Sequence, residues 1–257
     1  VASEYMYTNG YFDNPQDFHR LNIFGKYRGK IGTNNTLSFS ASAFGSKWNA
    51  SGQIPERALQ SGLIGYFGAI DPNEGGSTHR TNLNAELQTN FGNGNSIKNQ
   101  LYYTNYDFEL YSNFTFFLNN DVDGDQIKQK EKRNLFGYNS TYTNIAYLGN
   151  KRFTSEAGIG VRMDKTKDNE LSRTKDRNIV IQPVKLGDIA ETNSSIWLNE
   201  TIRWNERFSI NTGLRWDRFD VSYKDKLDNV KVSKEKASIV SPKLNFYYQL
   251  NDKTQLI

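Results

Sequence analysis

The chain has 257 residues, of which 23% are charged, and its mean hydropathy is −0.74. No apolar run approaches the roughly 20 residues that a membrane-spanning helix needs, so the composition excludes a helical membrane protein. The formal net charge of +4 is too small to indicate a nucleic-acid partner.

Strand-like alternation of apolar and polar side chains begins near the N-terminus. Residues 18–30 fit a period of two better than a helical period, although the pattern is irregular. Residues 36–47 show the period clearly, because Leu37, Phe39 and Ala41 alternate with serine and threonine. Successive side chains of a pleated strand point to opposite faces, so each segment is predicted to be a strand with one apolar and one polar face.

The clearest predicted strand lies at residues 77–91. Leu83, Leu87 and Phe91 belong to a face that carries no charge between residues 81 and 91, and the opposite face, which includes Glu86, is polar throughout. Weaker or shorter versions of this alternation lie at residues 97–111, 135–148, 155–163, 194–204, 207–217 and 243–250. Together with a strand-like run at the N-terminus, these segments predict about eleven strands and argue against helices.

The connections between the predicted strands are alternately short and long. Short turns rich in Gly, Asn, Asp or Lys are predicted at residues 29–35, 91–96, 148–152, 204–208 and 250–254. Long polar connections are predicted at residues 49–76, 112–130, 164–190 and 224–235, whereas the first connection, at 13–17, is short. Outer-membrane barrels have short periplasmic turns and longer extracellular loops, so we expect the long connections to face the outside.

Long strands with one apolar and one polar face are typical of a barrel wall around a watery lumen. We therefore predict an all-β fold, an antiparallel transmembrane β-barrel segment. The chain begins and ends within strand-like runs, and a barrel must close to leave no unpaired backbone edge in lipid. Residues 1–257 are thus expected to be part of a larger barrel domain, whose terminal strands are absent here.

Two stretches of the sequence carry a family resemblance. The first reads SGQIPERA at residues 51–58, FGAIDP at 67–72 and GGSTHR at 75–80. The second reads YDFELYSNFTFFL at residues 106–118, followed by GDQI at 124–127. Both resemble the barrel region of TonB-dependent outer-membrane receptors.

The resemblance implies a barrel of about 22 strands in a Gram-negative outer membrane, of which this chain is about the middle half. It also implies an N-terminal plug domain and a TonB-contacting segment, both absent here. The implied partners are outer-membrane lipid and lipopolysaccharide, the plug domain of the same parent chain, TonB, and a small solute such as a ferric siderophore. The implied function is energy-coupled uptake of that scarce solute, without a cofactor.

Other functions use similar architectures. A passive porin-like channel has the same wall and needs no plug, so a plug-sized domain upstream would favour the receptor. A receptor of the same architecture could instead transport an oligosaccharide or cobalamin. A soluble β-sandwich is disfavoured, because sandwich strands are usually about five or six residues long.

Functional residues are predicted in the lumen and in the loops. Charged side chains that line a pore set its field and its affinity for a passing solute or for a plug. Those predicted to face the lumen or its outer mouth are Arg80, Glu86, Asp107, Arg162, Arg203, Arg215 and Asp217. The aromatic residues assigned to the loops, which either stack on a ligand or pack the loops and mark the lipid interface, are Trp48, Tyr66, Phe67, Phe114, Phe116 and Phe117.

A calcium site is weakly indicated. Asp121, Asp123 and Asp125 open a calcium-like loop, but Gln126 and Lys132 stand where such a loop has its glycine and its glutamate. A solvated loop tip is the favoured interpretation.

No enzymatic activity is predicted. The histidines His19 and His79 are isolated in sequence, and no spacing motif gives either of them metal-binding partners. The sequence shows no nucleophile elbow, phosphate-binding loop or paired-carboxylate motif, so no cofactor is expected either.

Overall fold

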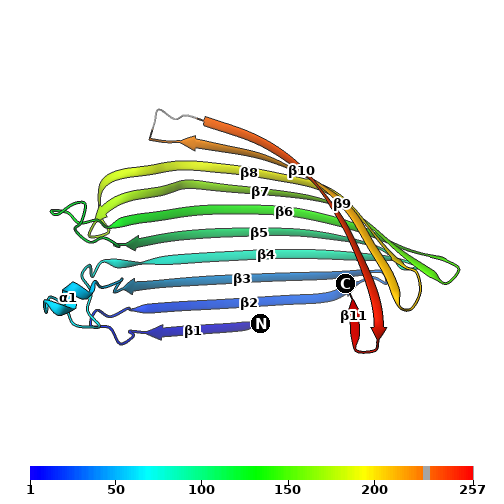
Figure 1. The fold of residues 1–257 in the computed structure, drawn as a ribbon, viewed down its shortest axis with the longest axis horizontal. Coiled ribbons are helices and arrows are strands. Elements are labelled where there is room, and N and C mark those ends of the chain that lie inside the picture. The colour runs from blue at the N-terminus through cyan, green and yellow to red at the C-terminus, as the bar shows by residue number, and fades with distance from the viewer. Residues whose placement is uncertain (228–231, 257) are drawn as a thin grey trace.

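The computed structural model describes residues 1–227 and 232–256. They form one eleven-stranded antiparallel sheet in which each strand pairs with its neighbours in sequence (Figure 1). The strands are β1 (Ala2–Thr8), β2 (Phe18–Ile31), β3 (Asn35–Ala50), β4 (Glu74–Gly92), β5 (Asn95–Ser112), β6 (Ile127–Leu148), β7 (Lys151–Lys175), β8 (Ile179–Arg203), β9 (Phe208–Asp225), β10 (Val232–Asn251) and β11 (Thr254–Leu256). The antiparallel all-β fold and the expected number of strands are confirmed. The predicted connection at 224–235 lies partly outside the described residues.

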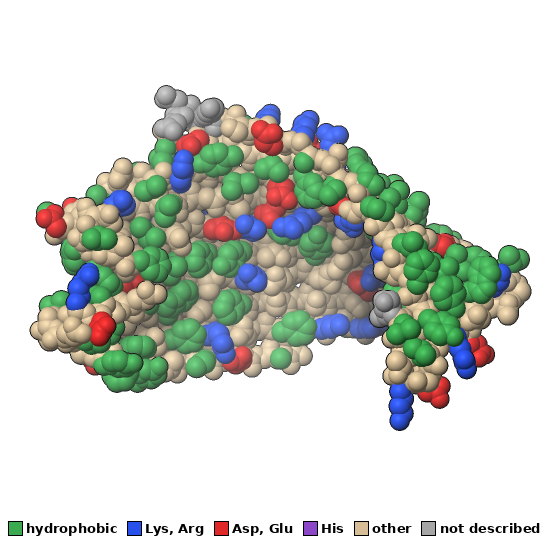
Figure 2. Space-filling view, in the orientation of Figure 1, with side chains coloured by type: hydrophobic (Ala, Val, Ile, Leu, Met, Phe, Trp, Pro, Cys, Tyr) green, Lys and Arg blue, Asp and Glu red, His purple; other side chains and the backbone are tan. Residues whose placement is uncertain are grey.

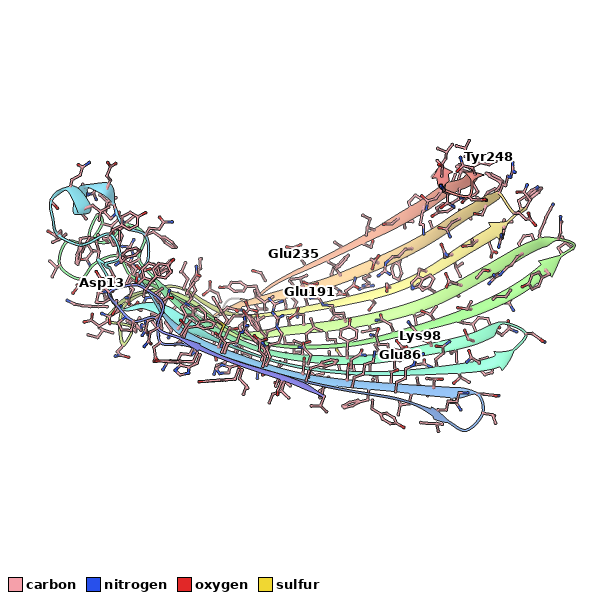
Figure 3. All side chains as sticks on the ribbon, turned by 90° about the horizontal axis from the view of Figure 1, so that it is seen from below. Asp13, Glu86, Lys98, Glu191, Glu235 and Tyr248 are labelled. Atoms are coloured by element: carbon pink, nitrogen blue, oxygen red, sulfur yellow. The ribbon has the colours of Figure 1, made fainter. Side chains whose placement is uncertain are left out.

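The sheet is curved into an open trough with a concave and a convex face (Figure 3). Glu86 and Lys98, whose charged groups lie 3.4 Å apart, are on the concave face. Because side chains alternate along a strand, Leu83 and Leu87 lie on the convex face, where they are 40% and 37% exposed. On the neighbouring strand β3, apolar side chains also point to the convex face, since Leu37 of β3 is the register partner of Leu87. The prediction of one apolar and one polar face for residues 77–91 is confirmed.

The short and long connections lie at opposite ends of the sheet (Figure 1). All five short turns occur where the sequence predicts them. Three of them contain a residue with positive φ, namely Gly32 (65°), Asn93 (50°) and Gly149 (61°). Glycine and asparagine adopt this left-handed backbone more readily than other residues, which explains their place in these turns.

The prediction of a long connection at 164–190 is wrong. β7 and β8 continue through it as a hairpin, and only residues 176–178 lie between the two strands. The register of β7 with both neighbours shifts around Asp168, whose φ is 51°. A bulge of one residue reverses the phase of the alternation, and polar residues occupy both faces beyond it. The sequence pattern therefore disappears although the backbone ladder continues.

Two smaller predictions are corrected at the same end of the sheet. The first connection runs over residues 9–17 rather than 13–17, because β1 ends at Thr8. The connection between β3 and β4 contains a short helix, α1 (Glu56–Gln60), which is anchored by the buried side chain of Ala58. None of the helices in the described residues is long and apolar enough to cross a membrane.

The described sheet contains almost no apolar core. The buried apolar residues of the described chain are Ala58 in α1, Tyr111 in β5 and Phe116 in the β5–β6 connection, and the largest fully buried side chains are Thr174 and Ser172 in β7. The fold is therefore held mainly by the hydrogen bonds of the antiparallel ladder. This is expected for a single sheet that has an apolar environment on one face and a polar environment on the other.

The substitutions Leu87→Arg and Gln88→Arg test the assignment of the two faces. Counted from the turn at Gly94, both residues fall within the roughly 9–11 residues with which a tilted strand crosses the hydrocarbon. Leu87→Arg should lower the free energy of unfolding by about 2–4 kcal/mol, because it places a cation in lipid. Gln88→Arg should leave it nearly unchanged, because water solvates the concave face. Reversible unfolding of the complete parent barrel in lipid vesicles measures both, and equal destabilisation would contradict the assignment.

Candidate functional site on the concave face and outer connections

Paired charges lie across the concave face, beginning on β6 and β7. Asp164 accepts hydrogen bonds from two guanidinium groups, from Arg162 at 2.8 Å and from Arg133 at 3.2 Å. Arg133 also pairs with Glu131 at 2.5 Å. Figure 2 shows acidic and basic side chains gathered across the middle of the hollowed face.

The array of charges continues on β8 and β9. Arg215 donates two hydrogen bonds to Asp217, at 2.6 and 2.8 Å, and Asn193 donates a third at 3.4 Å. Asn193 is the register partner of Arg162, so the two groups of charges adjoin. The Arg162 and Arg215 side chains remain 45% and 46% exposed, which leaves both cations able to contact a molecule inside the trough.

The charged residues of β4 and β5 on the concave face lie apart from this array. The guanidinium of Arg80 lies over the ring of Tyr106, 4.8 Å from its centre, and Glu86 forms an ion pair with Lys98. Between them, amide side chains bond across strands, as Gln100 does to Asn84 at 2.8 Å. Arg80 and Glu86 thus lie on the predicted face, outside the charge array of β6 to β9.

Two of the predicted lumen residues do not join this array. Asp107 pairs in register with His79 and Lys132 on the convex face, so its side chain does not face the lumen. The outer half of its strand is polar on both faces, which hides the phase of the alternation. Arg203 shares the concave face but is the last residue of β8, opposite Arg152 and beside the short turns.

At the other end of the sheet, Arg177 connects three outer segments. Its Nε donates to the carbonyl of Asn73 at 2.6 Å, and its Nη2 donates to Oδ1 of Asn49 at 3.0 Å and to the carbonyl of Glu74. Its guanidinium also lies 5.8 Å from the ring centre of Tyr111. A single side chain therefore crosslinks the β7–β8 tip to residues 103 to 128 positions away in sequence.

Gln126 completes this buried network and is only 2% exposed. Its Nε2 donates to Oδ2 of Asp71 at 3.0 Å, and its Oε1 accepts from the hydroxyl of Thr174 and from the backbone N–H of Arg177, both at 3.0 Å. Asp71 also accepts from the side chain of Asn113 at 2.9 Å. A buried network with its partners in place fixes the relative positions of the outer connections.

Glu74 borders the network at the outer end of β4, beyond the residues that cross the hydrocarbon, and is 4% exposed. Burial raises the pKa of Glu74 to about 7; the backbone N–H of Asn113 opposes this rise, and the nearby carboxylate of Asp71 adds to it. Its Oε1 has no hydrogen-bond partner among the described residues, and Gly52 packs against it so closely that no Cβ would fit there. This carboxyl therefore titrates near neutral pH.

Four aromatic rings form an exposed cluster on the outer connections. Phe67 contacts Tyr11, Phe12 and Tyr66, and Tyr11 stacks on Phe12, with ring centres 4.9 to 6.3 Å apart. Tyr11 and Tyr66 are 74% and 73% exposed, so the cluster presents ring surfaces to solvent. Tyr11 and Phe12 are additions to the predicted set, because the sequence pattern places them before the first connection.

The remaining predicted aromatics differ from one another. Phe114 and Phe117 are 62% and 54% exposed, whereas Phe116 is 8% exposed and has a φ of 58°. Trp48 does not lie in a loop; it belongs to β3, where its register partner is Gly76 of β4. The side chain of Trp48 needs the space that a glycine leaves.

The calcium-like loop has other partners for its carboxylates. Lys175 donates to Asp123 at 2.9 Å, and this hydrogen bond lowers the pKa of Asp123. Asp125 accepts the backbone N–H groups of Asn119 and Asn120, at 2.9 and 3.0 Å. Within residues 1–227 and 232–256, no group of three or more His, Cys, Asp or Glu side chains is arranged to hold a metal ion.

The family of the chain follows from its sequence and its architecture together. A family model described as TonB dependent receptor-like, beta-barrel matches residues 6–257. The chain belongs to the TonB-dependent receptor family. The resemblance seen in residues 51–80 and 106–127 is therefore confirmed. No curated protein matches the chain.

Solved structures share the fold of this TonB-dependent receptor segment. The ferric citrate transporter FecA, unliganded, matches with a TM-score of 0.79 and 11% identity over 94% of this chain and 35% of its own. The siderophore receptor PiuA from Acinetobacter baumannii matches with a TM-score of 0.72 and 13% identity over 97% of this chain and 42% of its own. The copper transporter OprC matches with a TM-score of 0.62 and 11% identity over 93% of this chain and 35% of its own. The chain thus spans well under half of each, and at these identities the likeness shows the fold alone.

Arg177→Lys tests the crosslink between the outer connections. Lysine keeps the charge but cannot reach two carbonyls and Asn49 with one planar group, so we expect local opening to become easier by about 1.5–3 kcal/mol. Hydrogen exchange of residues 49–76 in the complete receptor measures this change. Arg173→Lys is the control, because Arg173 makes no ion pair or side-chain hydrogen bond with the described residues. Equal exchange in both variants would show that Arg177 does not hold the connections.

Glu74 should make the outer connections more stable in mild acid. Its pKa is about 7 when folded and 4.5 in the absence of burial, so the folded state binds the extra proton between these values. The stability that protonation of Glu74 contributes is therefore fully present below about pH 4.5 and is lost as the pH rises through 7. Hydrogen-exchange protection of residues 49–76, corrected for intrinsic rates, should fall from pH 5.5 to 8. Glu74→Gln should abolish this fall, and an unchanged pH dependence would contradict the assignment.

Proposed function

We propose that this chain is part of an outer-membrane receptor that takes up a scarce solute in an energy-coupled manner. A ferric siderophore or a similar metal complex is the first substrate class to test. The family match over residues 6–257 is the observation that carries the proposal. The family and the similar solved structures are receptors and transporters, and the proposal assigns no catalytic step to this chain.

The concave face suits an anionic solute or a charged protein segment. The half-exposed guanidinium groups of Arg162 and Arg215 are held in place by Asp164 and Asp217, so they attract a negative group without losing much side-chain entropy. The plug domain of the parent chain would face the same array and would contact it when no solute passes. The exposed rings of Tyr11 and Tyr66 offer a first, apolar contact at the outer end.

Membrane lipid, lipopolysaccharide, a plug and TonB are the partners that this proposal requires. The convex face supplies the lipid contact, since its leucines are exposed in the isolated sheet. A passive porin-like channel and a receptor for an oligosaccharide or cobalamin remain the alternatives. The likeness to OprC keeps a copper complex among the substrates to test, because that structure is named as a copper transporter.

Uptake of radiolabelled iron tests the proposal directly. The complete parent receptor would be produced in cells that lack other iron receptors, and supplied with a panel of ferric siderophores at low concentration. We expect accumulation that requires TonB. Accumulation that is equal without TonB would instead favour a passive channel.

A matched pair of arginines tests the role of the concave face. Arg215 and Arg218 lie on β9, each pairs with an aspartate two residues later at 2.6 and 2.9 Å, and their side chains are 46% and 47% exposed. Only Arg215 faces the trough. Arg215→Gln should weaken solute binding about tenfold, since it removes one charge-assisted contact. Arg218→Gln should leave binding unchanged, and a similar loss in both would exclude a specific role for the concave charge.

A further inference from the structure

A row of polar side chains lies across the convex face near the short turns. Asn144, Ser155, Glu200 and Thr212 are successive register partners on β6, β7, β8 and β9. At one end of the row, Asn144 donates to Asn95 at 2.7 Å, at the first residue after the β4–β5 turn. The row therefore begins at the edge of the sheet formed by the short turns and crosses four neighbouring strands, with one residue from each.

Glu200 points to the convex face, because both of its neighbours along β8 point to the concave face. Asn211 donates to Asn199 and to Thr201, each at 2.9 Å, across the concave side. Side chains alternate along a strand, so Glu200 shares the face of the exposed Leu198.

Apolar residues border the polar row on both sides. On the side of the long connections, Leu198 pairs with Leu214, and the two are 62% and 52% exposed. On the side of the short turns, Ile202 pairs with Ile210. A carboxyl group thus stands inside the apolar surface of the sheet, where an ionisable residue indicates a functional site.

The depth of Glu200 follows from the residues that mark the two ends of the apolar surface. Near the short turns, the ammonium of Lys151 lies over Trp204, 3.3 Å from the ring centre, as expected at a membrane interface. Glu200 precedes Trp204 by four residues, which is about 10 Å along the membrane normal for a tilted strand. On the far side, Arg218 of the convex face is the register partner of Ser194, six residues from Glu200 and about 14 Å away by the same estimate. Glu200 therefore lies within the hydrocarbon, in the half that borders the short turns.

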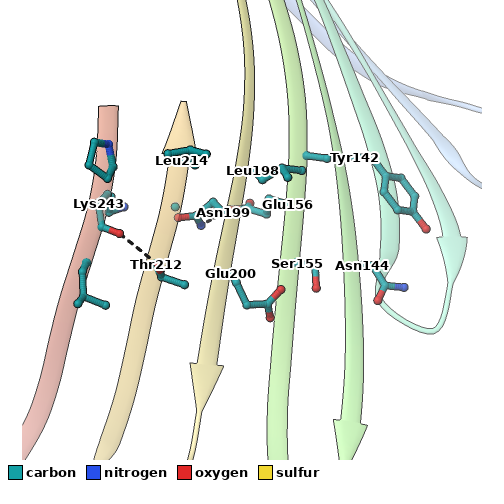
Figure 4. A pocket seen from close by; sticks show the side chains of 14 residues that line it. Tyr142, Asn144, Ser155, Glu156, Leu198, Asn199, Glu200, Thr212, Leu214 and Lys243 are labelled. Carbon is teal, nitrogen blue, oxygen red and sulfur yellow. Dashed lines mark hydrogen bonds between the residues drawn. The ribbon is translucent and has the colours of Figure 1, made fainter. Parts of the chain in front are cut away.

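A groove of about 800 Å³ surrounds the carboxyl group (Figure 4). Leu198, Leu214 and Leu244 supply apolar walls, and Ser155 and Glu200 supply polar groups. Figure 4 shows the carboxylate of Glu200 extending toward β7, where Ser155 lies. The Oε1 atom of Glu200 is buried and has no hydrogen-bond partner in the described part of the chain. The groove thus has apolar walls and one unsatisfied acceptor.

We propose that this groove binds a phospholipid with a primary-amine headgroup, of the phosphatidylethanolamine type, from the leaflet that borders the short turns. Acyl chains match the leucine walls, and the ammonium group supplies the N–H donor that Glu200 lacks. The polar row from Asn95 through Asn144 and Ser155 gives the headgroup a series of polar side chains from the rim to Glu200. A choline headgroup carries the same charge but has no N–H to donate, and an anionic headgroup is repelled by the carboxylate.

This inference rests on the proposed membrane location. Quenching of a fluorophore by brominated lipid tests the lipid site and the membrane location with different outcomes. The described chain has no cysteine, so Ile196→Cys, beside the groove on the convex face, can carry a single small fluorophore once other cysteines of the parent are replaced. The complete receptor would be reconstituted in phosphatidylcholine vesicles with increasing fractions of lipid brominated on its acyl chains. The brominated lipid is either phosphatidylethanolamine or phosphatidylcholine.

We expect half-maximal quenching at a roughly tenfold lower fraction of the ethanolamine lipid, which is the effect of about one charge-assisted hydrogen bond. Glu200→Gln and Glu200→Leu should each reduce this preference to less than about twofold. Glu191→Gln, which removes a carboxylate from the concave face of the same strand, should preserve it. Equal quenching by both lipids, or an unchanged preference in both Glu200 variants, would overturn the lipid site. Absence of quenching by either lipid would contradict the membrane location itself.

Discussion

Backbone hydrogen bonding is the constraint on which the rest of this structure depends. In lipid, each N–H and C=O group must find its partner inside the protein, and the antiparallel ladder provides such partners for the strands from β2 to β10, which have a neighbour on both sides. Once the ladder is satisfied, side chains need only match the surroundings of their own face. Leu87 and Gln88 are adjacent in sequence and differ in their surroundings only because they point in opposite directions. A sheet of this kind is stable without an apolar core.

Beyond the lipid, a different set of interactions maintains order. Arg177 and Gln126 bind backbone carbonyls, amides and a carboxylate from three connections, so the outer end is held by a buried polar network rather than by apolar packing. The charges of the concave face lie deeper, on strands whose positions the ladder fixes. Glu74, which borders the buried polar network, makes the stability of the outer end depend on pH near neutrality.

The sequence reveals those features that depend on near neighbours. The alternation of residues 77–91 predicts both faces of β4, and glycine or asparagine at Gly32, Asn93 and Gly149 marks the turns. It does not reveal contacts between distant segments: nothing near Arg177 indicates that its partners lie more than 100 residues away. It also fails where both faces of a strand meet water, as at Asp107, because polar residues are then acceptable on either side. Glu200 shows the converse, since its isolated charge within an apolar surface is visible only after the register is known.

The bulge at Asp168 has a consequence for where the strand tolerates an insertion. Below the bulge, the identity of each residue of β7 is tied to lipid or lumen, and a single insertion would exchange the two. Above it, the phase has already been reset, so the outer part of the hairpin can gain or lose residues without moving any side chain in the membrane. The bulge therefore separates a part of β7 in which an insertion would exchange the two faces from a part in which it would not.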